Sequence, residues 1–243
     1  ARPAEQNDAV VVEFVQRVVA AGGAGADVIG ELGIGINPAV GAPCGYTLTD
    51  EKILGTVHIA GSSKATNHDR IPLQSEIRYS AAPAYVHMTS NNTIFGTQWH
   101  HLPDVPQGVP LVNDASSDIF CRPVDIQRYG MIYGGEQKNL SIAGLTLVVV
   151  REDLLGKAPA STPVYLNYAT HAKERSPYNT PPVFGIYILH LVLKHLLAEG
   201  GLAAVEARNR RKAAKLYAAI DASGGYYRGH AQPESRSWMN VTY

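Results

Sequence analysis

The chain has 243 residues, of which 45% are hydrophobic and 17% are charged, and its 21 Lys and Arg residues balance its 21 Asp and Glu residues. A chain of this length can form one large domain or two small ones, and its even charge excludes the basic footprint of a nucleic-acid-binding protein. No apolar run reaches the roughly 18 residues of a membrane span. Two cysteines, Cys44 and Cys121, are too few for a disulfide framework, so a reducing cytoplasm is the expected compartment.

The first predicted element covers residues 8–21. Val11, Phe14 and Val18 fall on one side of a helix there, and polar side chains fall on the other. Because β-branched valines lower helix propensity, a strand remains the alternative for this segment.

Two motifs within residues 28–60 carry side chains that bind metals in other proteins. ELGIGINP at 31–38 and GTVHIA at 55–60 together resemble the metalloaminopeptidases of the aminopeptidase T type. In that family each motif supplies one metal ligand, which implies Glu31 and His58 here. A catalytic metal site needs at least three protein ligands, and the family's other ligand segments are not found, so we expect no metal site.

Three short apolar runs, at 84–88, 110–114 and 131–133, predict strands of an α/β sheet. The second run ends on Asp114, and the third is followed by two glycines and then Lys138. Ligands and catalytic groups gather at the edge where such strands end. A solvated loop lysine remains the more common interpretation of such a residue, since most lysines are exposed.

An acid and a lysine at the ends of neighbouring strands suit pyridoxal phosphate chemistry. The lysine amine forms a Schiff base with the cofactor aldehyde, and the acid holds the ring nitrogen protonated so that the ring can act as an electron sink. Asp114 and Lys138 are the candidates for these two tasks.

The second half of the chain predicts one further strand and two helices. The apolar run 143–151 suits the centre of a sheet with both faces covered. A helix is expected to begin near Thr180, a good N-cap residue, with Pro181 in its first turn. Its free N–H groups could hold an anion, although a plain helix cap is an equally common interpretation.

The helix over 185–199 is expected to turn an apolar face to the core, and a second long helix is expected over 202–220. The apolar positions share helical spacing and are Ile186, Leu189, Leu193, Leu196 and Leu197.

Four motifs in this order resemble phosphoserine aminotransferase, a family of fold-type I pyridoxal-phosphate enzymes. They are YVHMTSNNTIFGTQW at 85–99, VPLVNDASSDIFCRP at 109–123, YGMIYGGEQKN at 129–139 and SPYNTPP at 176–182. The similarity runs from about residue 60 to residue 243.

The resemblance assigns a role to each candidate residue. Lys138 holds the cofactor covalently and moves the substrate α-proton, while Asp114 faces the ring nitrogen. Thr93, in the polar loop after the first strand, lies on the phenolic-oxygen side of the ring; its alternative is a turn-forming threonine. Gln137 contacts the cofactor phosphate. Residues Asn179–Thr180 reach across a homodimer interface to the partner's cofactor phosphate.

The resemblance also predicts the fold and its divisions. Residues 60–199 are expected to form part of the large domain of fold type I, a mostly parallel sheet carrying helices. Residues 200–243 begin a smaller α+β domain, and residues 1–59 form a separate, peptidase-like N-terminal segment. Both ends look cut, because the family extends beyond them with a phosphate loop, a stacking aromatic and a further arginine.

The implied reaction transfers an amino group from glutamate to 3-phosphohydroxypyruvate, giving phosphoserine and 2-oxoglutarate, in serine biosynthesis. The expected partners are therefore small amino and keto acids and a second copy of the chain. Two alternatives remain: a metal-dependent aminopeptidase-like hydrolase, and a non-catalytic α/β scaffold that dimerises.

Overall fold

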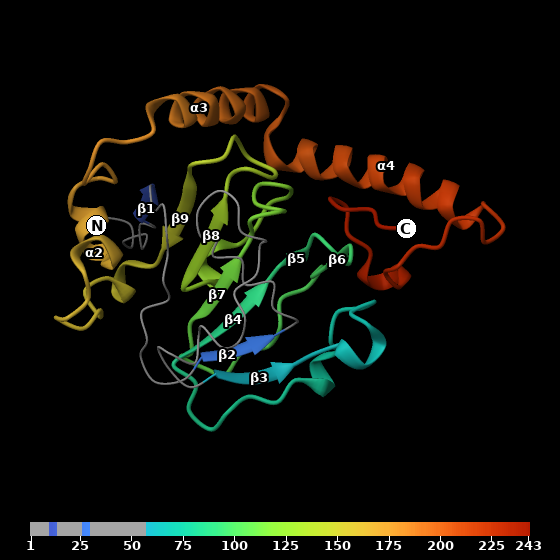
Figure 1. The fold of residues 1–243 in the computed structure, drawn as a ribbon, viewed down its shortest axis with the longest axis horizontal. Helices are drawn as coiled ribbons and strands as arrows, with labels where there is room; N and C mark the ends of the chain where they lie inside the picture. Colours follow the sequence, from blue (N-terminus) through green and yellow to red (C-terminus); the bar gives the residue numbers. More distant parts are fainter. Residues whose placement is uncertain (1–9, 14–25, 30–56) are drawn as a thin grey trace, which may run out of the picture.

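A computed structural model describes residues 10–13, 26–29 and 57–243 (Figure 1). Within these residues one mixed sheet runs in the order β1-β9-β8-β7-β4-β2-β3. Its strands are β1 (Val10–Glu13), β2 (Ala26–Ile29), β3 (Val57–Gly61), β4 (Tyr85–Thr89), β7 (Leu111–Asp114), β8 (Met131–Gly135) and β9 (Thr146–Val150). A short hairpin, β5 (Asn91–Asn92) and β6 (Thr97–Gln98), follows β4.

Most neighbouring strands are parallel, as the sequence predicts. The pairs β2–β3, β2–β4, β4–β7 and β7–β8 are parallel, whereas β9 runs antiparallel to both β8 and β1. The strands predicted from the three apolar runs are confirmed as β4, β7 and β8. Because these three are parallel, their carboxyl ends lie at one edge of the sheet.

The N-terminal segment contributes strands to this same sheet. Residues 10–13 are a strand, so the helix expected there is wrong and the β-branched alternative holds, while the rest of 8–21 lies outside the described residues. Strand β2 lies between β3 and β4.

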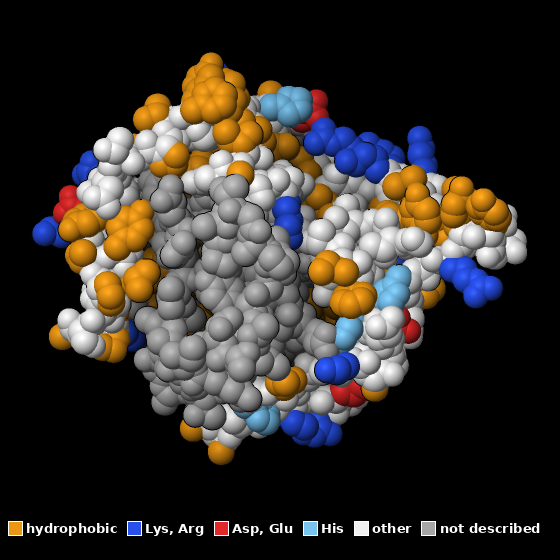
Figure 2. Space-filling view, in the orientation of Figure 1, with side chains coloured by type: hydrophobic (Ala, Val, Ile, Leu, Met, Phe, Trp, Pro, Cys, Tyr) orange, Lys and Arg blue, Asp and Glu red, His pale blue; other side chains and the backbone are white. Residues whose placement is uncertain are grey.

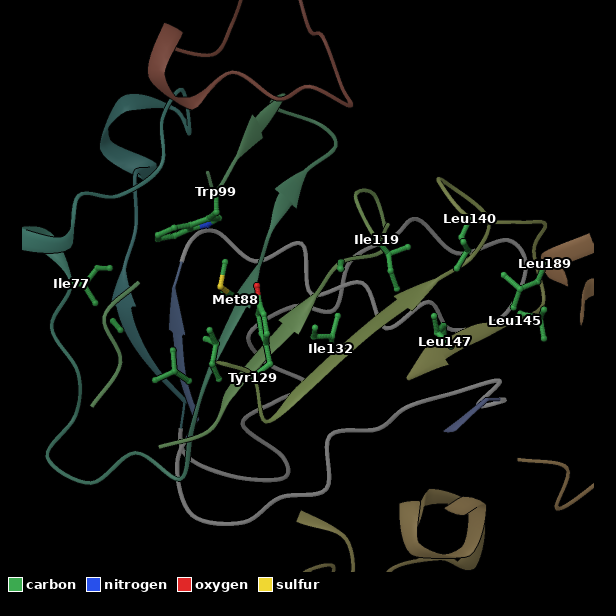
Figure 3. Close-up of a cluster of buried hydrophobic side chains, with 14 residues drawn as sticks. Ile77, Met88, Trp99, Ile119, Tyr129, Ile132, Leu140, Leu145, Leu147 and Leu189 are labelled. Carbon is green, nitrogen blue, oxygen red and sulfur yellow. The ribbon is translucent and has the colours of Figure 1, made fainter. Parts of the chain in front are cut away.

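The two faces of the sheet bury different clusters. One face carries Val86, Met88 and Ile132 into the main core, whose labelled side chains appear in Figure 3. The other face buries Tyr133 and Val148, and helix α2 (Tyr168–Lys173) packs there. This alternation follows from the period of two along a strand. The main core continues beneath the sheet edge through Ile119 and Leu140, which belong to the loops after β7 and β8.

Helix α3 (Val183–Ala198) lies over the top of the sheet in Figure 1, and α4 (Gly201–Asp221) extends from it past the C-terminal segment. Gly185 allows α3 to pack closely against Leu145, because an added Cβ at position 185 would lie 3.1 Å from Leu145 Cδ1. Both helices are close to their predicted ranges. In the described residues no single helix has the length and apolarity to cross a membrane.

Two details of α3 differ from the sequence-based expectation. The helix begins at Val183 with Pro182 at the N-cap and no side-chain cap, so Thr180 does not cap it. Two prolines in succession delay the start, because each lacks an N–H and the residue before a proline avoids the helical region. Leu197 is exposed rather than buried, since it lies in the last turn of the helix.

Leu189 and Leu197 provide a test of this packing. Leu189 is 5% exposed and Leu197 is 76% exposed, although both lie on α3. We expect Leu189→Ala to lower the free energy of unfolding by about 2–4 kcal/mol, because it leaves a cavity in the core. Leu197→Ala should change it by less than about 0.5 kcal/mol. Urea unfolding of both variants measures the difference, and equal losses would contradict the packing described.

Candidate active site

Three loops bring candidate residues together at the carboxyl edge of β4, β7 and β8. Thr93 lies in the turn of the β5–β6 hairpin, Asp114 ends β7, and Lys138 follows β8. The Lys138 Nζ donates a hydrogen bond to Thr93 Oγ1 at 3.0 Å. Residues 45 positions apart in the sequence thus place an amine and a hydroxyl in direct contact.

Asp114 is a buried acid beside this contact. Asp114 is 3% exposed, and its Oδ1 accepts a hydrogen bond from the Ser116 N–H at 2.9 Å. Burial raises the pKa of Asp114 to about 6, because the charged form loses its hydration. The hydrogen bonds from Ser116 and the positive charge of Lys138 lower this pKa, but by less than burial raises it. A cation placed beside the carboxylate would therefore favour its ionised form.

The loop that carries Lys138 is tied to the loop after β7. The Gly135 N–H donates to Ser116 Oγ at 3.0 Å, and Asn139 Nδ2 donates to the Ile119 carbonyl at 2.7 Å. The exposed Gln137 side chain folds back over Gly135, where an added Cβ would lie only 2.7 Å from Gln137 Oε1. Gly135 thus leaves the space that the Gln137 amide occupies.

An asparagine shapes the turn that carries Thr93. Asn92 Oδ1 accepts hydrogen bonds from the N–H groups of Ile94 at 3.0 Å and Phe95 at 3.1 Å. Gly96 closes the turn with a φ of +67°, and a Cβ there would lie 2.5 Å from Thr242 Oγ1. Only glycine fits a site with both constraints. Thr93 is therefore a turn residue and also a hydrogen-bond partner of Lys138.

Asn179 and Thr180 lie apart from this group in the single chain. Both are exposed, and within the described residues neither has a hydrogen bond to Lys138, Thr93 or Asp114. The structure therefore brings together Thr93, Asp114 and Lys138, with Gln137 on the same loop.

The candidate metal ligands do not form a site in the described part of the chain. Glu31 lies outside the described residues. His58 is exposed, and its Nε2 is 2.7 Å from the Arg78 carbonyl oxygen. Residues 57–243 together with the two described N-terminal strands contain no group of three His, Cys, Asp or Glu side chains placed to hold a metal ion.

Two buried polar residues near the site, His87 and Asp118, were not predicted from the sequence. His87 Nε2 lies 3.0 Å from Tyr133 Oη, and burial lowers the pKa of His87 to about 4, so its ring is neutral. Asp118 Oδ1 accepts from Ser90 Oγ at 2.5 Å. One sequence signal could have indicated His87. His87 and Thr89 are two residues apart on one strand and so lie on the same face, and Thr89 pairs with Asp114 on the next strand.

The side chains at this edge fit pyridoxal phosphate. The cofactor requires an amine that can condense with an aldehyde and an acid that faces a pyridinium nitrogen. Lys138 supplies the amine, and Asp114 is a buried acid whose ionised form a cation would stabilise. The model for class-V aminotransferases matches residues 54–243.

This chain belongs to the class-V aminotransferases.

Phosphoserine aminotransferases are among its relatives. The chain is 54% identical to the enzyme of Herpetosiphon aurantiacus over 190 residues, which are 78% of this chain and 52% of that protein. It is 53% identical to the enzyme of Lysinibacillus sphaericus over 194 residues, 80% of this chain and 53% of that protein. This class-V aminotransferase chain thus spans about half the length of the curated relatives it matches.

Solved structures agree with the family. The phosphoserine aminotransferase from Bacillus circulans subsp. alkalophilus superposes with a TM-score of 0.78 at 48% identity, over 80% of this chain and 54% of that one. A phosphoserine aminotransferase structure described for radiation damage of its Schiff base has a TM-score of 0.83 at 39% identity, over 98% of this chain and 66% of that one. The peptidase resemblance of residues 28–60 gains no support from these relatives.

Proposed function

We propose that this class-V aminotransferase chain binds pyridoxal phosphate through Lys138 and carries the cofactor-binding part of a phosphoserine aminotransferase. The observation that carries the proposal is the contact of Lys138 Nζ with Thr93 Oγ1 beside the buried acid Asp114. The relatives that are about half identical to the chain are phosphoserine aminotransferases, and one related structure is described by its Schiff base.

Each of three residues has a task that follows from its position. When bound, pyridoxal phosphate supplies an aldehyde for amines and a ring that withdraws electrons. Lys138 would hold it covalently through Nζ and would move the α-proton of the substrate as a general base and acid. The Thr93 hydroxyl orients Nζ. Asp114 provides the negative charge that keeps the ring nitrogen protonated.

The phosphate of the cofactor needs donors from other residues. Gln137, next to Lys138, supplies its side-chain amide from the same loop. Asn179 and Thr180 are exposed in the single chain, and we assign them to the cofactor phosphate of a partner subunit. This assignment accounts for two polar side chains that do not reach the Lys138 group of their own chain.

The substrates proposed are glutamate with 3-phosphohydroxypyruvate, and phosphoserine with 2-oxoglutarate in the reverse direction, as in serine biosynthesis in the cytoplasm. We also propose that residues 60–199 belong to the large domain and that residues 200–243 begin the smaller domain. Residues 1–59 are the N-terminal segment that precedes them.

Two measurements test the function. The purified chain is mixed with pyridoxal phosphate, the visible spectrum is recorded, and borohydride reduction followed by peptide mapping locates the covalent label. Amino transfer from phosphoserine to 2-oxoglutarate is then measured, with alanine as the competing donor. A label at Lys138 without amino transfer would support cofactor binding alone, and a chain that takes up no label would contradict the proposal.

An exposed apolar surface on α3 supports dimerisation. Val183, Phe184 and Tyr187 are exposed on the first turns of the helix that follows Asn179–Thr180. Figure 2 shows hydrophobic side chains gathered over α3, whereas Lys and Arg side chains gather over α4. A contiguous apolar surface of this kind marks an interaction site.

We expect the chain to have about twice its mass of 26.1 kDa by light scattering at micromolar concentration. Phe184→Asp should shift it towards the monomer, because a charge is costly at the centre of an interface. Leu216→Asp, at an exposed apolar position on α4, is the matched control and should leave the mass unchanged. A monomeric wild-type chain would contradict the proposed dimer.

A further inference from the structure

One buried asparagine joins the Thr93 hairpin to two distant parts of the chain. Asn91 is 2% exposed, and its Nδ2 donates to Ser117 Oγ at 2.8 Å and to Asn240 Oδ1 at 2.7 Å. Its Oδ1 accepts from Ser237 Oγ at 2.5 Å. The amide therefore uses both of its donor hydrogens and its acceptor, with partners 26, 149 and 146 residues away.

The first of these partners leads to Asp114 and to the Lys138 loop. Ser117 lies three residues after Asp114, and its hydroxyl donates back to the Asn91 carbonyl at 2.8 Å. The neighbouring Ser116 caps Asp114 through its N–H and accepts from Gly135 N–H in the loop that leads to Lys138. The loops that carry Thr93, Asp114 and Lys138 are thus connected through a serine pair and one asparagine.

The other partners lie in the segment after α4. Ser237 is fully buried, and its Oγ accepts from the N–H groups of Met239 at 3.0 Å and Asn240 at 2.9 Å. Its own N–H donates to the Gly96 carbonyl at 2.9 Å, and Thr242 Oγ1 donates to the Phe95 carbonyl at 3.1 Å. The segment from Ser237 to Thr242 therefore packs directly against the hairpin turn.

From these contacts we infer that Asn91 is a positioning residue, which sets the Thr93 hydroxyl at the Lys138 amine by fixing the β5–β6 hairpin between the Asp114 loop and the segment 237–242. Asn91 does not touch Lys138 and acts through the turn that follows it. This inference rests on the proposed function for its effect on the cofactor, while its effect on the hairpin is independent of that function.

Removal of the Asn91 side chain is expected to have a large effect on the hairpin. A buried network is rigid when every member is satisfied, and the loss of one member leaves its partners buried without hydrogen bonds. Asn91→Ala would leave the Ser237 hydroxyl and the Asn240 amide oxygen without this partner. The Ser237 N–H and the Thr242 hydroxyl still hold the hairpin turn in this variant, so we expect the hairpin to remain in place while the distance between Thr93 Oγ1 and Lys138 Nζ varies more widely.

Asn209 is the matched control for the loss of a buried asparagine. It is 5% exposed on α4, and its Nδ2 donates to the Cys121 carbonyl at 3.3 Å, which lies outside the hairpin. Asn209→Ala therefore lowers stability without releasing the turn. Ser117→Ala removes both hydrogen bonds between the Ser117 hydroxyl and Asn91 but keeps those of Asn91 to Asn240 and Ser237, so it is a milder variant that is used if Asn91→Ala does not fold.

The experiment compares wild type, Asn91→Ala and Asn209→Ala in two ways. Hydrogen exchange of residues 92–98 is measured without cofactor, and the apparent Kd for pyridoxal phosphate is measured by absorbance. We expect Asn91→Ala to speed the exchange of these amides and to raise the Kd at least about 10-fold, a change of about 1.4 kcal/mol. Asn209→Ala should leave both within about twofold of wild type, although its unfolding midpoint falls.

Equal effects of Asn91→Ala and Asn209→Ala on the Kd would overturn the inference, because they would reflect general loss of stability. Unchanged exchange in residues 92–98 would overturn it as well. If the wild-type chain binds no pyridoxal phosphate, the proposed function fails, but the exchange measurement still decides whether Asn91 fixes the hairpin.

Discussion

Lys138→Ala is expected to abolish the covalent binding of pyridoxal phosphate. The Lys138 amine lies 3.0 Å from Thr93 Oγ1 and within the electrostatic reach of Asp114, so its removal takes away both the covalent anchor and the group that moves the proton. Amino transfer should fall by about 10²- to 10⁴-fold or more, the range for loss of a general acid–base alone.

The measurement is borohydride reduction with peptide mapping, followed by a transamination assay. Lys157→Ala, at an exposed lysine in another loop, is the matched control and should keep the label and the activity. A label of wild-type yield on any other lysine of Lys138→Ala would remove the basis for assigning this residue.

Asp114→Asn is expected to retain the covalent label at Lys138 while it slows amino transfer. Asparagine has nearly the shape of aspartate but carries no charge to hold the ring nitrogen protonated. Loss of one preorganised electrostatic group typically costs about 10²- to 10³-fold in rate. Retention of the label separates this effect from unfolding. Asp104→Asn, at an exposed position, is the control, and a wild-type rate in Asp114→Asn would exclude the proposed role.

The same substitution is expected to change how stability depends on pH in the cofactor-free chain. Burial raises the pKa of Asp114 from 3.8 to about 6, so between these values the folded state binds more protons than the unfolded state. The contribution of Asp114 to the free energy of unfolding therefore falls as pH rises through this window, by about 3 kcal/mol for a shift of this size.

His87 changes the free energy of unfolding in the opposite direction to Asp114 over nearly the same pH range. Burial lowers its pKa from 6.5 to about 4, so its contribution to stability rises with pH. Asp118, whose pKa burial also raises, adds to the trend of Asp114. The quantity to measure is therefore the difference between wild type and Asp114→Asn in urea unfolding at several pH values. That difference should shift in favour of Asp114→Asn as pH rises from about 4 to about 6, and a constant difference would show that Asp114 ionises normally.

The sheet edge could be predicted from the sequence because its signals are local. Short apolar runs that end at Asp114 and before Lys138 follow from the burial of strands, and parallel strands place their ends together. The long helices were predicted for the same reason, since apolar positions recur with the helical period. Helix α3 shows where prediction from periodicity fails. The helical spacing placed Leu197 on the buried face, but Leu197 is exposed because the helix has left the core at that position.

The contacts that organise the candidate site carry no comparable local signal. Asn91 and Asn240 are 149 residues apart, and each alone is typical of an exposed turn. Whether an amide side chain is solvated or buried in a network depends on which segments meet around it.

The amino-acid sequence by itself determined the family motifs, the strands that end at the candidate site and the chemical types of the candidate residues, since these depend on side-chain identity and on periodicity along the chain. Only the tertiary structure decided that Lys138 touches Thr93, that Asp114 is buried enough to shift its pKa, and that Asn91 joins three segments. The physical reason is that hydrogen-bond distance and loss of hydration depend on neighbours supplied by remote parts of the chain.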